Sequence, residues 1–316
     1  MPEKIHLTAT IPLEMAQQRL DQALAQCFPQ HSRARLQEWV KLNMVTVDGK
    51  FKRGKDKILG GEKIEIMGEV TSKVPSEAQP IPLNIIYEDG AILVLNKPAG
   101  LVVHPAAGNR DNTLLNALLF AYPALENVPR AGIVHRLDKD TSGILVVAKT
   151  LTAHTHLVNQ LQKRSMKREY QAVIKGTLIS GGRIDEPIGR HAQQRKKMTV
   201  TSSGKTAITE YRVLKRFVHH TLIKVSLHTG RTHQIRVHMA HIKHPIVGDP
   251  VYGGRFQIPK SASEDLVKTL HSFKRQALHA YRLELTHPET GETMAWTAEL
   301  PQDMQHLLKV LHDHST

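Results

Sequence analysis

Apolar positions follow a helical period near the start of the chain and alternate as in strands soon afterwards. The spacing predicts two short helices within residues 17–42, with Ser32 as the N-cap of the second. A strand at 44–47, a tight turn at Asp48-Gly49 and an alternating strand at 63–66 follow. Together these elements predict a compact unit of about 50 residues.

Residues 68–82 contain three prolines and few apolar positions, which is typical of an interdomain linker. Beyond them, β-rich runs are predicted at 85–87, 92–95, 144–147, 170–174, 222–225 and 281–285, and helices near 113–121, 152–163, 231–241 and 302–312. Strands outnumber helices and are irregularly spaced, which favours an α+β domain with a largely antiparallel mixed sheet over a regular βαβ array. The predicted domains are therefore residues 17–67 and 83–316, and a length of 316 residues agrees with two domains.

Charge narrows the class of binding partner. The chain has 43 Lys and Arg against 29 Asp and Glu, a net charge of +14, and residues 163–216 alone hold 14 basic and 4 acidic residues. Such a local surplus predicts a face that binds a polyanion such as nucleic acid, although an uneven charge count without a partner is the alternative. The same segment has few apolar anchors, which argues against a membrane-surface helix.

Other classes are excluded by what the sequence lacks. The single cysteine, Cys27, excludes an internal disulfide framework and a Cys-rich zinc site. No apolar run approaches the ~18 residues of a membrane span, and the first residues do not resemble a signal peptide, so we expect a cytoplasmic protein. Walker and Rossmann glycine patterns are absent from the sequence, which gives no indication of a nucleotide cofactor.

The densest polar stretch, residues 132–143, lies between two apolar runs. A loop held between strands commonly carries chemistry, whereas the structural alternative is a turn capped by Asp140 or Thr141. A glycosidase pair formed by Asp138 and Asp140 is disfavoured, because neighbouring loop positions rarely face each other across a sugar. No nucleophile elbow surrounds Ser142, so that hydroxyl is a weak candidate nucleophile.

A second polar stretch carries Arg231 and Arg236 around the start of a predicted helix. Their guanidinium groups suit phosphate or a buried carboxylate, and a solvated helix face is the alternative. Histidines at helical intervals could suggest a metal, but no cysteine or carboxylate accompanies them in that helix, so zinc is not favoured; they are His238, His241 and His244.

A third stretch places two cations beside an aromatic residue. Lys167 and Arg168 precede Tyr170, an arrangement that suits a stacked base flanked by phosphates. Because tyrosine is also common in strands, Tyr170 alone is a weak indicator.

Taken together, the polar stretches resemble the RluA family of pseudouridine synthases, and in particular its members that modify large-subunit ribosomal RNA. The matching motifs occur in the family's order at 96–105, 135–143, 168–170 and 230–236. The resemblance extends from about residue 83 to 300. Residues 17–67 resemble, more loosely, a small α/β S4 RNA-binding module, with Arg33 and Arg35 as candidate RNA contacts.

The resemblance implies an isomerase that converts uridine to pseudouridine in 23S ribosomal RNA, at the helix 69 hairpin loop. It implies that Asp138 is the essential carboxylate, that Arg231 is its guanidinium partner, and that Tyr170 stacks on the uracil. The base must be flipped out of its stack. Further candidate RNA contacts are His135, Arg136, Lys167, Arg168 and Arg236, with Arg136 filling the gap left by the flipped base.

Asp138 could attack C1′ as a nucleophile or take the proton from C2′, and the sequence leaves both routes open. We expect no metal and no cofactor, a monomer, and 23S ribosomal RNA as the partner, either free or within the assembling large subunit. The alternatives are a paralogous synthase that acts on other 23S uridines and a non-catalytic RNA-binding or ribosome-assembly protein.

Overall fold

The computed structural model describes residues 3–29, 31, 33–70, 77–105, 108–194, 197–255, 258–259 and 262–315. The chain divides into two compact units, residues 1–75 and residues 76–316. Ser32, the predicted N-cap, lies outside the described residues, as do Arg195 and Lys196 of the basic segment.

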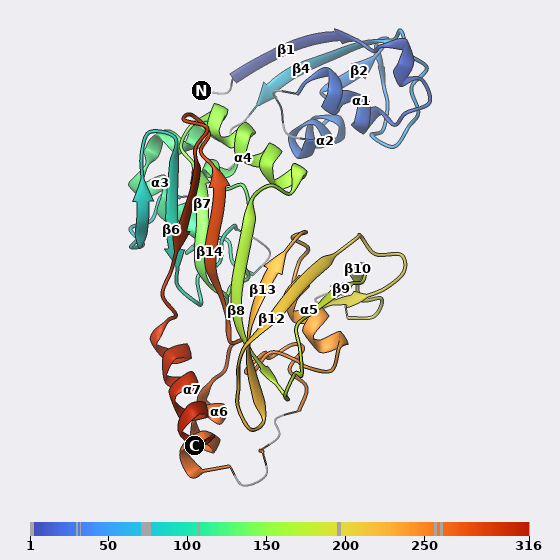
Figure 1. The fold of residues 1–316 in the computed structure, drawn as a ribbon. Helices are drawn as coiled ribbons and strands as arrows, with labels where there is room; N and C mark the ends of the chain where they lie inside the picture. Colours follow the sequence, from blue (N-terminus) through green and yellow to red (C-terminus); the bar gives the residue numbers. More distant parts are fainter. Residues whose placement is uncertain are drawn as a thin grey trace. The chain divides into compact units, whose positions relative to one another are not determined.

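The first unit is a four-stranded antiparallel sheet with two helices (Figure 1). Its elements are β1 (Glu3–Thr10), η1 (Leu13–Met15), α1 (Leu20–Cys27), α2 (Arg33–Lys41), β2 (Val45–Val47), β3 (Lys50–Phe51) and β4 (Lys63–Val70). Strand β1 was not predicted, although it pairs with β4 along its whole length. Because β4 continues to Val70, the first three residues of the predicted linker belong to this sheet.

The second unit is built on a nine-stranded sheet, which confirms the predicted α+β fold class. Its strands in spatial order are β5 (Ile85–Glu88), β6 (Ile92–Lys97), β7 (Ser142–Ala148), β14 (Leu278–Thr286), β8 (Lys167–Lys175), β13 (His220–Leu227), β12 (Ile208–Arg216) and β9 (Gly182–Asp185), with β15 (Thr293–Thr297) also on β14. The β7–β14 pair is parallel, and the other pairs of this sheet are antiparallel. A separate hairpin joins β10 (Ile188–Arg190) to β11 (Met198–Val200).

Helices and short turns lie on both faces of this sheet (Figure 1). They are α3 (Leu114–Ala121), η2 (Pro123–Asn127), η3 (Pro129–Gly132), α4 (Leu151–Lys163), α5 (Gln234–His241), α6 (Glu264–Ser272) and α7 (Gln302–Asp313). Among the described residues, no helix is both long and apolar enough to cross a membrane.

Strand β7 is buried along its whole length. Alternate side chains of a strand point to opposite faces, so Ile144 and Val146 join the core beneath α4 while Leu145 and Val147 join the larger core on the other face. A strand covered on both faces reads as a continuous apolar run, which explains why this segment was predicted from sequence. The loop that enters β7 is therefore attached to a rigid central element.

Candidate active site

Asp138 lies in the loop between η3 and β7, and a buried lysine holds this loop in place. Lys97 Nζ donates to the carbonyl oxygens of Pro98 at 2.7 Å, Leu101 at 3.0 Å and Lys139 at 3.0 Å. Burial lowers the pKa of Lys97 to about 7, while the nearby Asp140 and Asp138 act in the opposite direction. The motif at 96–105 therefore anchors the loop residue that follows Asp138.

The other end of the loop is tied to the strand pair β7–β14. Gln276 Nε2 donates to the Thr141 hydroxyl at 3.0 Å. His279 Nε2 donates to the Ala298 carbonyl at 3.1 Å, so its Nδ1 accepts from the Ser142 hydroxyl at 2.9 Å. These buried contacts fix the direction in which the chain leaves Asp138.

The carboxylate of Asp138 contacts a guanidinium group from the first turn of α5. Arg236 Nη1 donates to Asp138 Oδ2 at 2.9 Å, and the Asp138 side chain keeps 17% of its surface exposed. We predicted Arg231 for this position, and the structure corrects that prediction: Arg231 Nε instead donates to the Thr206 carbonyl at 3.0 Å. The physical reason is that the chain turns before Gln234, so Arg231 precedes the helix while Arg236 lies within it.

Arg236 is also held by a second carboxylate. Its Nε and Nη2 donate to the two oxygens of Asp249, at 2.7 and 2.9 Å. Burial alone would raise the pKa of Asp249, but the hydrogen bonds and charge of Arg236 outweigh it and hold that pKa below its usual value. Asp249 and Asp138 in turn raise the pKa of Arg236, so this guanidinium is a permanent cation beside Asp138.

His233 lies on another side of the same carboxylate. Its Nε2 is 3.9 Å from Asp138 Oδ1, and its Nδ1 is 2.8 Å from the Tyr252 hydroxyl. His233 has a left-handed backbone, with φ 57°, at the start of α5. Burial lowers the pKa of His233, and Asp138 acts in the opposite direction.

Tyr170 and Arg168 share one face of β8, because alternate residues of a strand point the same way. Tyr170 is 6% exposed, and burial raises the pKa of its phenol, with Arg168 opposing and Asp138 adding to the increase. The Arg168 guanidinium lies against Gly230, and its buried Nε has no hydrogen-bond partner among the described residues. Three separate motifs thus meet in one region: Asp138 comes from the first, Arg168 and Tyr170 from the second, and Arg236 from the third.

The remaining predicted contacts have different surroundings. Val146 donates its backbone N–H to His135 Nε2 at 3.1 Å, so His135 supports the loop from inside. Arg136 is exposed and forms no hydrogen bond or ion pair with the residues that the structure describes. Lys167 is paired with Glu284 at 2.6 Å. In the first unit, Arg33 is paired with the buried Asp21 at 2.9 Å, and Arg35 is exposed on α2.

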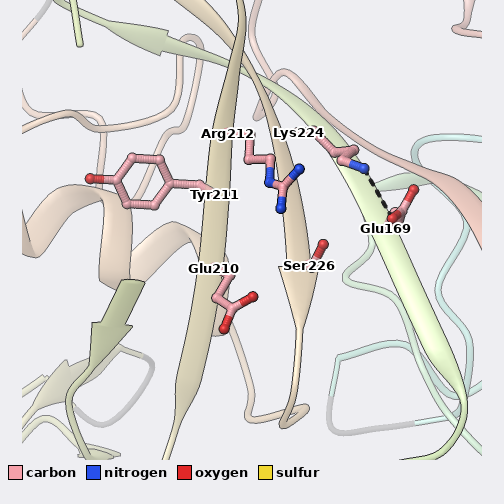
Figure 2. A pocket seen from close by; sticks show the side chains of 6 residues that line it. All are labelled: Glu169, Glu210, Tyr211, Arg212, Lys224 and Ser226. Atoms are coloured by element: carbon pink, nitrogen blue, oxygen red, sulfur yellow. Dashed lines mark hydrogen bonds and ion pairs between the residues drawn. The ribbon is translucent and has the colours of Figure 1, made fainter. Parts of the chain in front are cut away.

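A polar depression of about 170 Å³ lies on the sheet formed by β8, β13 and β12 (Figure 2). It is lined by Glu169, Glu210, Tyr211, Arg212, Lys224 and Ser226. Lys224 and Glu169 point toward each other and form an ion pair at 3.2 Å (Figure 2). Because Glu169 adjoins Tyr170 in β8, its side chain lies on the opposite face, and this depression is separate from the carboxylate site.

Two of the histidines that could have suggested a metal, His238 and His244, are hydrogen-bonded to the protein itself. His238 lies 2.8 Å from the Thr209 hydroxyl through Nδ1 and donates to the Glu186 carbonyl through Nε2 at 3.0 Å. His244 Nδ1 donates to the Lys175 carbonyl at 2.9 Å. Among the described residues, no group of three or more His, Cys, Asp or Glu side chains is arranged to hold a metal ion.

Comparison with known proteins identifies the family. Residues 91–241 match the family model of the RNA pseudouridylate synthases. The chain is 58% identical over 311 residues to ribosomal large subunit pseudouridine synthase D of Pseudomonas aeruginosa, covering 98% of this chain and 97% of that protein. The chain belongs to the RNA pseudouridylate synthase family. The family resemblance predicted from the sequence motifs is thereby confirmed.

Other relatives agree with this family membership. The chain is 54% identical over 312 residues to ribosomal large subunit pseudouridine synthase D of Escherichia coli K12, covering 98% of this chain and 96% of that protein. A solved structure of human RNA pseudouridylate synthase domain containing 4 superimposes with a TM-score of 0.58 at 25% identity, covering 72% of this chain and 93% of that one.

Sequence reasoning missed the residues that surround the Asp138–Arg236 pair. Asp249 and Tyr252 follow the last predicted motif, and their one local signal is Asp249-Pro250, a pair that favours a turn. Lys97 and His233 were within quoted motifs, but a linear pattern does not show which backbone or carboxylate a side chain meets after folding.

Proposed function

We propose that this protein converts uridine to pseudouridine in 23S ribosomal RNA, at the helix 69 hairpin loop, with Asp138 as the essential carboxylate. Family membership and the names of the 54–58% identical relatives, which are ribosomal large subunit pseudouridine synthases, support the reaction and the RNA. The helix 69 loop rests on the family resemblance of the motifs. Such a loop offers unstacked bases, which suits an enzyme that works on an extruded nucleoside.

The observation that carries the proposal is the ion pair between Asp138 and Arg236. Asp138 remains partly exposed while a 5% exposed guanidinium holds one of its oxygens at 2.9 Å. A carboxylate within a basic protein repels phosphate and is a poor RNA anchor, so its placement suits chemistry better than binding. A non-catalytic RNA-binding protein would have no use for a partly exposed carboxylate at this position.

The reaction breaks the N1–C1′ bond of uridine, turns the uracil and joins C5 to C1′, while a proton leaves C5 and N1 gains one. Asp138 begins this sequence either by attacking C1′ or by taking the C2′ proton. Asp138 Oδ2 is bonded to Arg236, which leaves Oδ1 as the oxygen available to the substrate. Tyr170 supplies an aromatic face for the uracil from β8, which is separated from β7 by β14.

The basic segment supplies sequence-independent affinity. Phosphate contacts position an RNA without reading its bases, and cations between residues 163 and 216 suit this role. Arg136 is exposed in the same loop as Asp138, which supports the proposal that it fills the gap left by a flipped base. In the first unit, which we propose is an S4-like RNA-binding domain, Arg33 and Arg35 are both exposed on α2 and are the candidate RNA contacts, and Arg33 also pairs with Asp21.

One chain contains every residue assigned to the reaction, so a monomer acting in the cytoplasm, where ribosomal subunits assemble, satisfies the proposal. The second candidate function is the same reaction at other 23S uridines, which the same site chemistry would serve.

The test is chemical mapping of pseudouridines in 23S RNA from cells that lack this gene and from cells that regain it. We expect the helix 69 positions to lose the modification and to recover it with the wild-type gene. Loss and recovery at other 23S positions would support the paralogous reaction instead. Unchanged maps would contradict both.

A further inference from the structure

The turn between α5 and α6 that contains Asp249 is held by hydrogen bonds within the turn itself. Asp249 Oδ1 accepts the backbone N–H groups of Val251 at 2.8 Å and Tyr252 at 3.0 Å. Gly253 donates its N–H to the Asp249 carbonyl at 3.0 Å. The Asp249 side chain has no exposed surface, so it cannot touch a substrate itself.

The turn presents two side chains to the groups that flank Asp138. Asp249 accepts hydrogen bonds from Nε and Nη2 of Arg236, and the remaining guanidinium nitrogen, Nη1, donates to Asp138. The Tyr252 ring lies 5.1 Å from the same guanidinium, within cation–π range. A guanidinium held at two nitrogens and over one face is fixed in plane and in rotation.

The hydroxyl of Tyr252 orients His233. Met198 donates its backbone N–H to Tyr252 Oη at 2.8 Å, which leaves the hydroxyl proton for Nδ1 of His233, also at 2.8 Å. In that tautomer the Nε2 proton of His233 faces Asp138 Oδ1 across 3.9 Å. The hydrogen bond from Met198 to Tyr252 also links the start of β11, which lies in the basic segment 163–216, to the region around Asp138.

We infer that the Gly248–Gly253 turn is the positioning element of the catalytic centre, in which Asp249 acts through Arg236 and Tyr252 acts through His233 to fix the carboxylate of Asp138. This inference rests on the proposed catalytic role of Asp138. Both are positioning residues, because Asp249 bonds Arg236 and Tyr252 bonds His233, and these two partners lie beside Asp138. Their effect is on the geometry of Asp138, and a displacement of about 1 Å at a reacting group can cost about 10²-fold in rate.

The first test is Asp249→Asn, assayed for kcat, KM, RNA affinity and thermal unfolding. We expect kcat to fall by about 10²-fold with RNA affinity unchanged. The matched control is Asp89→Asn, because Asp89 also accepts two backbone N–H groups two and three residues ahead, and its other oxygen contacts a buried side chain, His287, at 2.8 Å. Wild-type kcat in Asp249→Asn, or an equal loss in Asp89→Asn, contradicts the inference.

A double-mutant cycle distinguishes positioning from general support. If Asp249 acts through Arg236, then Asp249→Asn in an Arg236→Ala background costs no further kcat. Losses that multiply would show that Asp249 acts by another path and would overturn the inference. The Arg236→Ala chain leaves Asp249 as an unpaired buried charge, so folding of each variant is checked by circular dichroism.

Tyr252→Phe keeps the test decisive if the charge variants do not fold. It removes the hydroxyl that orients His233 and keeps the ring beside Arg236. We expect about a 10-fold lower kcat at unchanged RNA affinity. The control, Tyr122→Phe, removes a hydroxyl that donates to Glu88 at 2.7 Å and should leave kcat unchanged. Wild-type kcat in Tyr252→Phe contradicts the role of this residue.

The outcomes separate this inference from the proposed function. Turnover by Asp138→Asn would end the proposed role of Asp138, and with it this inference. An inactive Asp138→Asn together with fully active Asp249→Asn and Tyr252→Phe would end this inference alone.

Discussion

At the scale of single residues, His135 shows how the loop depends on a neutral imidazole. Its Nε2 accepts the Val146 N–H, and only an unprotonated nitrogen can accept. Burial lowers the pKa of His135 to about 3, and Arg168 adds to this decrease. The unfolded chain binds a proton at about pH 6.5, so between these two values acid favours unfolding.

We therefore predict that the cost of His135→Gln depends on pH. Because His135 is protonated in the unfolded chain and not in the folded one, the wild type loses up to about 1.4 kcal/mol of unfolding free energy for each pH unit below 6.5. Glutamine does not titrate, so the variant does not show this loss. The loss of unfolding free energy caused by His135→Gln, measured by urea unfolding, should be about 2 kcal/mol smaller at pH 5 than at pH 7.5. Val146→Ala, which removes methyl groups and no titratable group, should cost the same at both pH values. Equal costs for His135→Gln at both values would contradict the neutral imidazole.

The residue scale is also where sequence reasoning reached its limit. Asp138 and Tyr170 could be named because each stands in a specific motif. Arg231 and Arg236 lie in one motif, and the residue at which α5 begins must be known to decide which of them contacts Asp138. We expected a helix from 231, whereas it begins at Gln234 after the left-handed His233, and this difference determines which guanidinium faces Asp138.

At the scale of elements, the entry of the chain into β7 is fixed by a glycine. Gly143 has φ 114° and pairs with Ala280 of β14, where the two strands run parallel. A Cβ at this position would collide with the carbonyl oxygen and backbone nitrogen of Ala280. The close approach allows the loop carrying Asp138 to join the central strand.

We predict that Gly143→Ala lowers the free energy of unfolding by roughly 2–3 kcal/mol or more, because the backbone strain and the collision add. Turnover should fall with it, since Asp138 moves with the strand. Gly90→Ala is the control: a Cβ there meets no atom within 4 Å, and the change should stay within about 0.5 kcal/mol. Chemical unfolding of both variants measures this, and equal stabilities would refute the prediction.

Elements with a strong internal pattern could be predicted, and those defined by distant partners could not. The apolar run of β7 and the helical face of α4 are visible in sequence. The hairpin of β10 and β11 has strands of only three residues each, too short to show a periodic pattern. Met198 and Val200 pack on the cluster of Ile188, Ala207 and Val237 only after folding. Pairing register is a property of two segments, and one segment's pattern does not contain it.

At the scale of the whole chain, the number and spacing of the predicted strands and helices were enough for the fold class, and the order of the motifs was enough for the family. A net charge of +14, most of it in residues 163–216 with 14 basic and 4 acidic residues, indicated a polyanion, and four motifs in order indicated the family. The parallel contact between β7 and β14, which brings residues near 142 and 279 together, could not be read from sequence because it closes a long loop. That contact is what places the Asp138 loop at the centre of the sheet.

The measurement that tests the account most directly is single-turnover formation of pseudouridine in a helix 69 RNA by Asp138→Asn, with RNA affinity measured on the same preparation. We expect RNA affinity equal to that of the wild type and no detectable product, because the amide neither attacks C1′ nor takes the C2′ proton. Asp140→Asn, which removes a carboxylate two residues away in the same loop, should retain turnover. Product formed by Asp138→Asn at the wild-type rate would contradict the account.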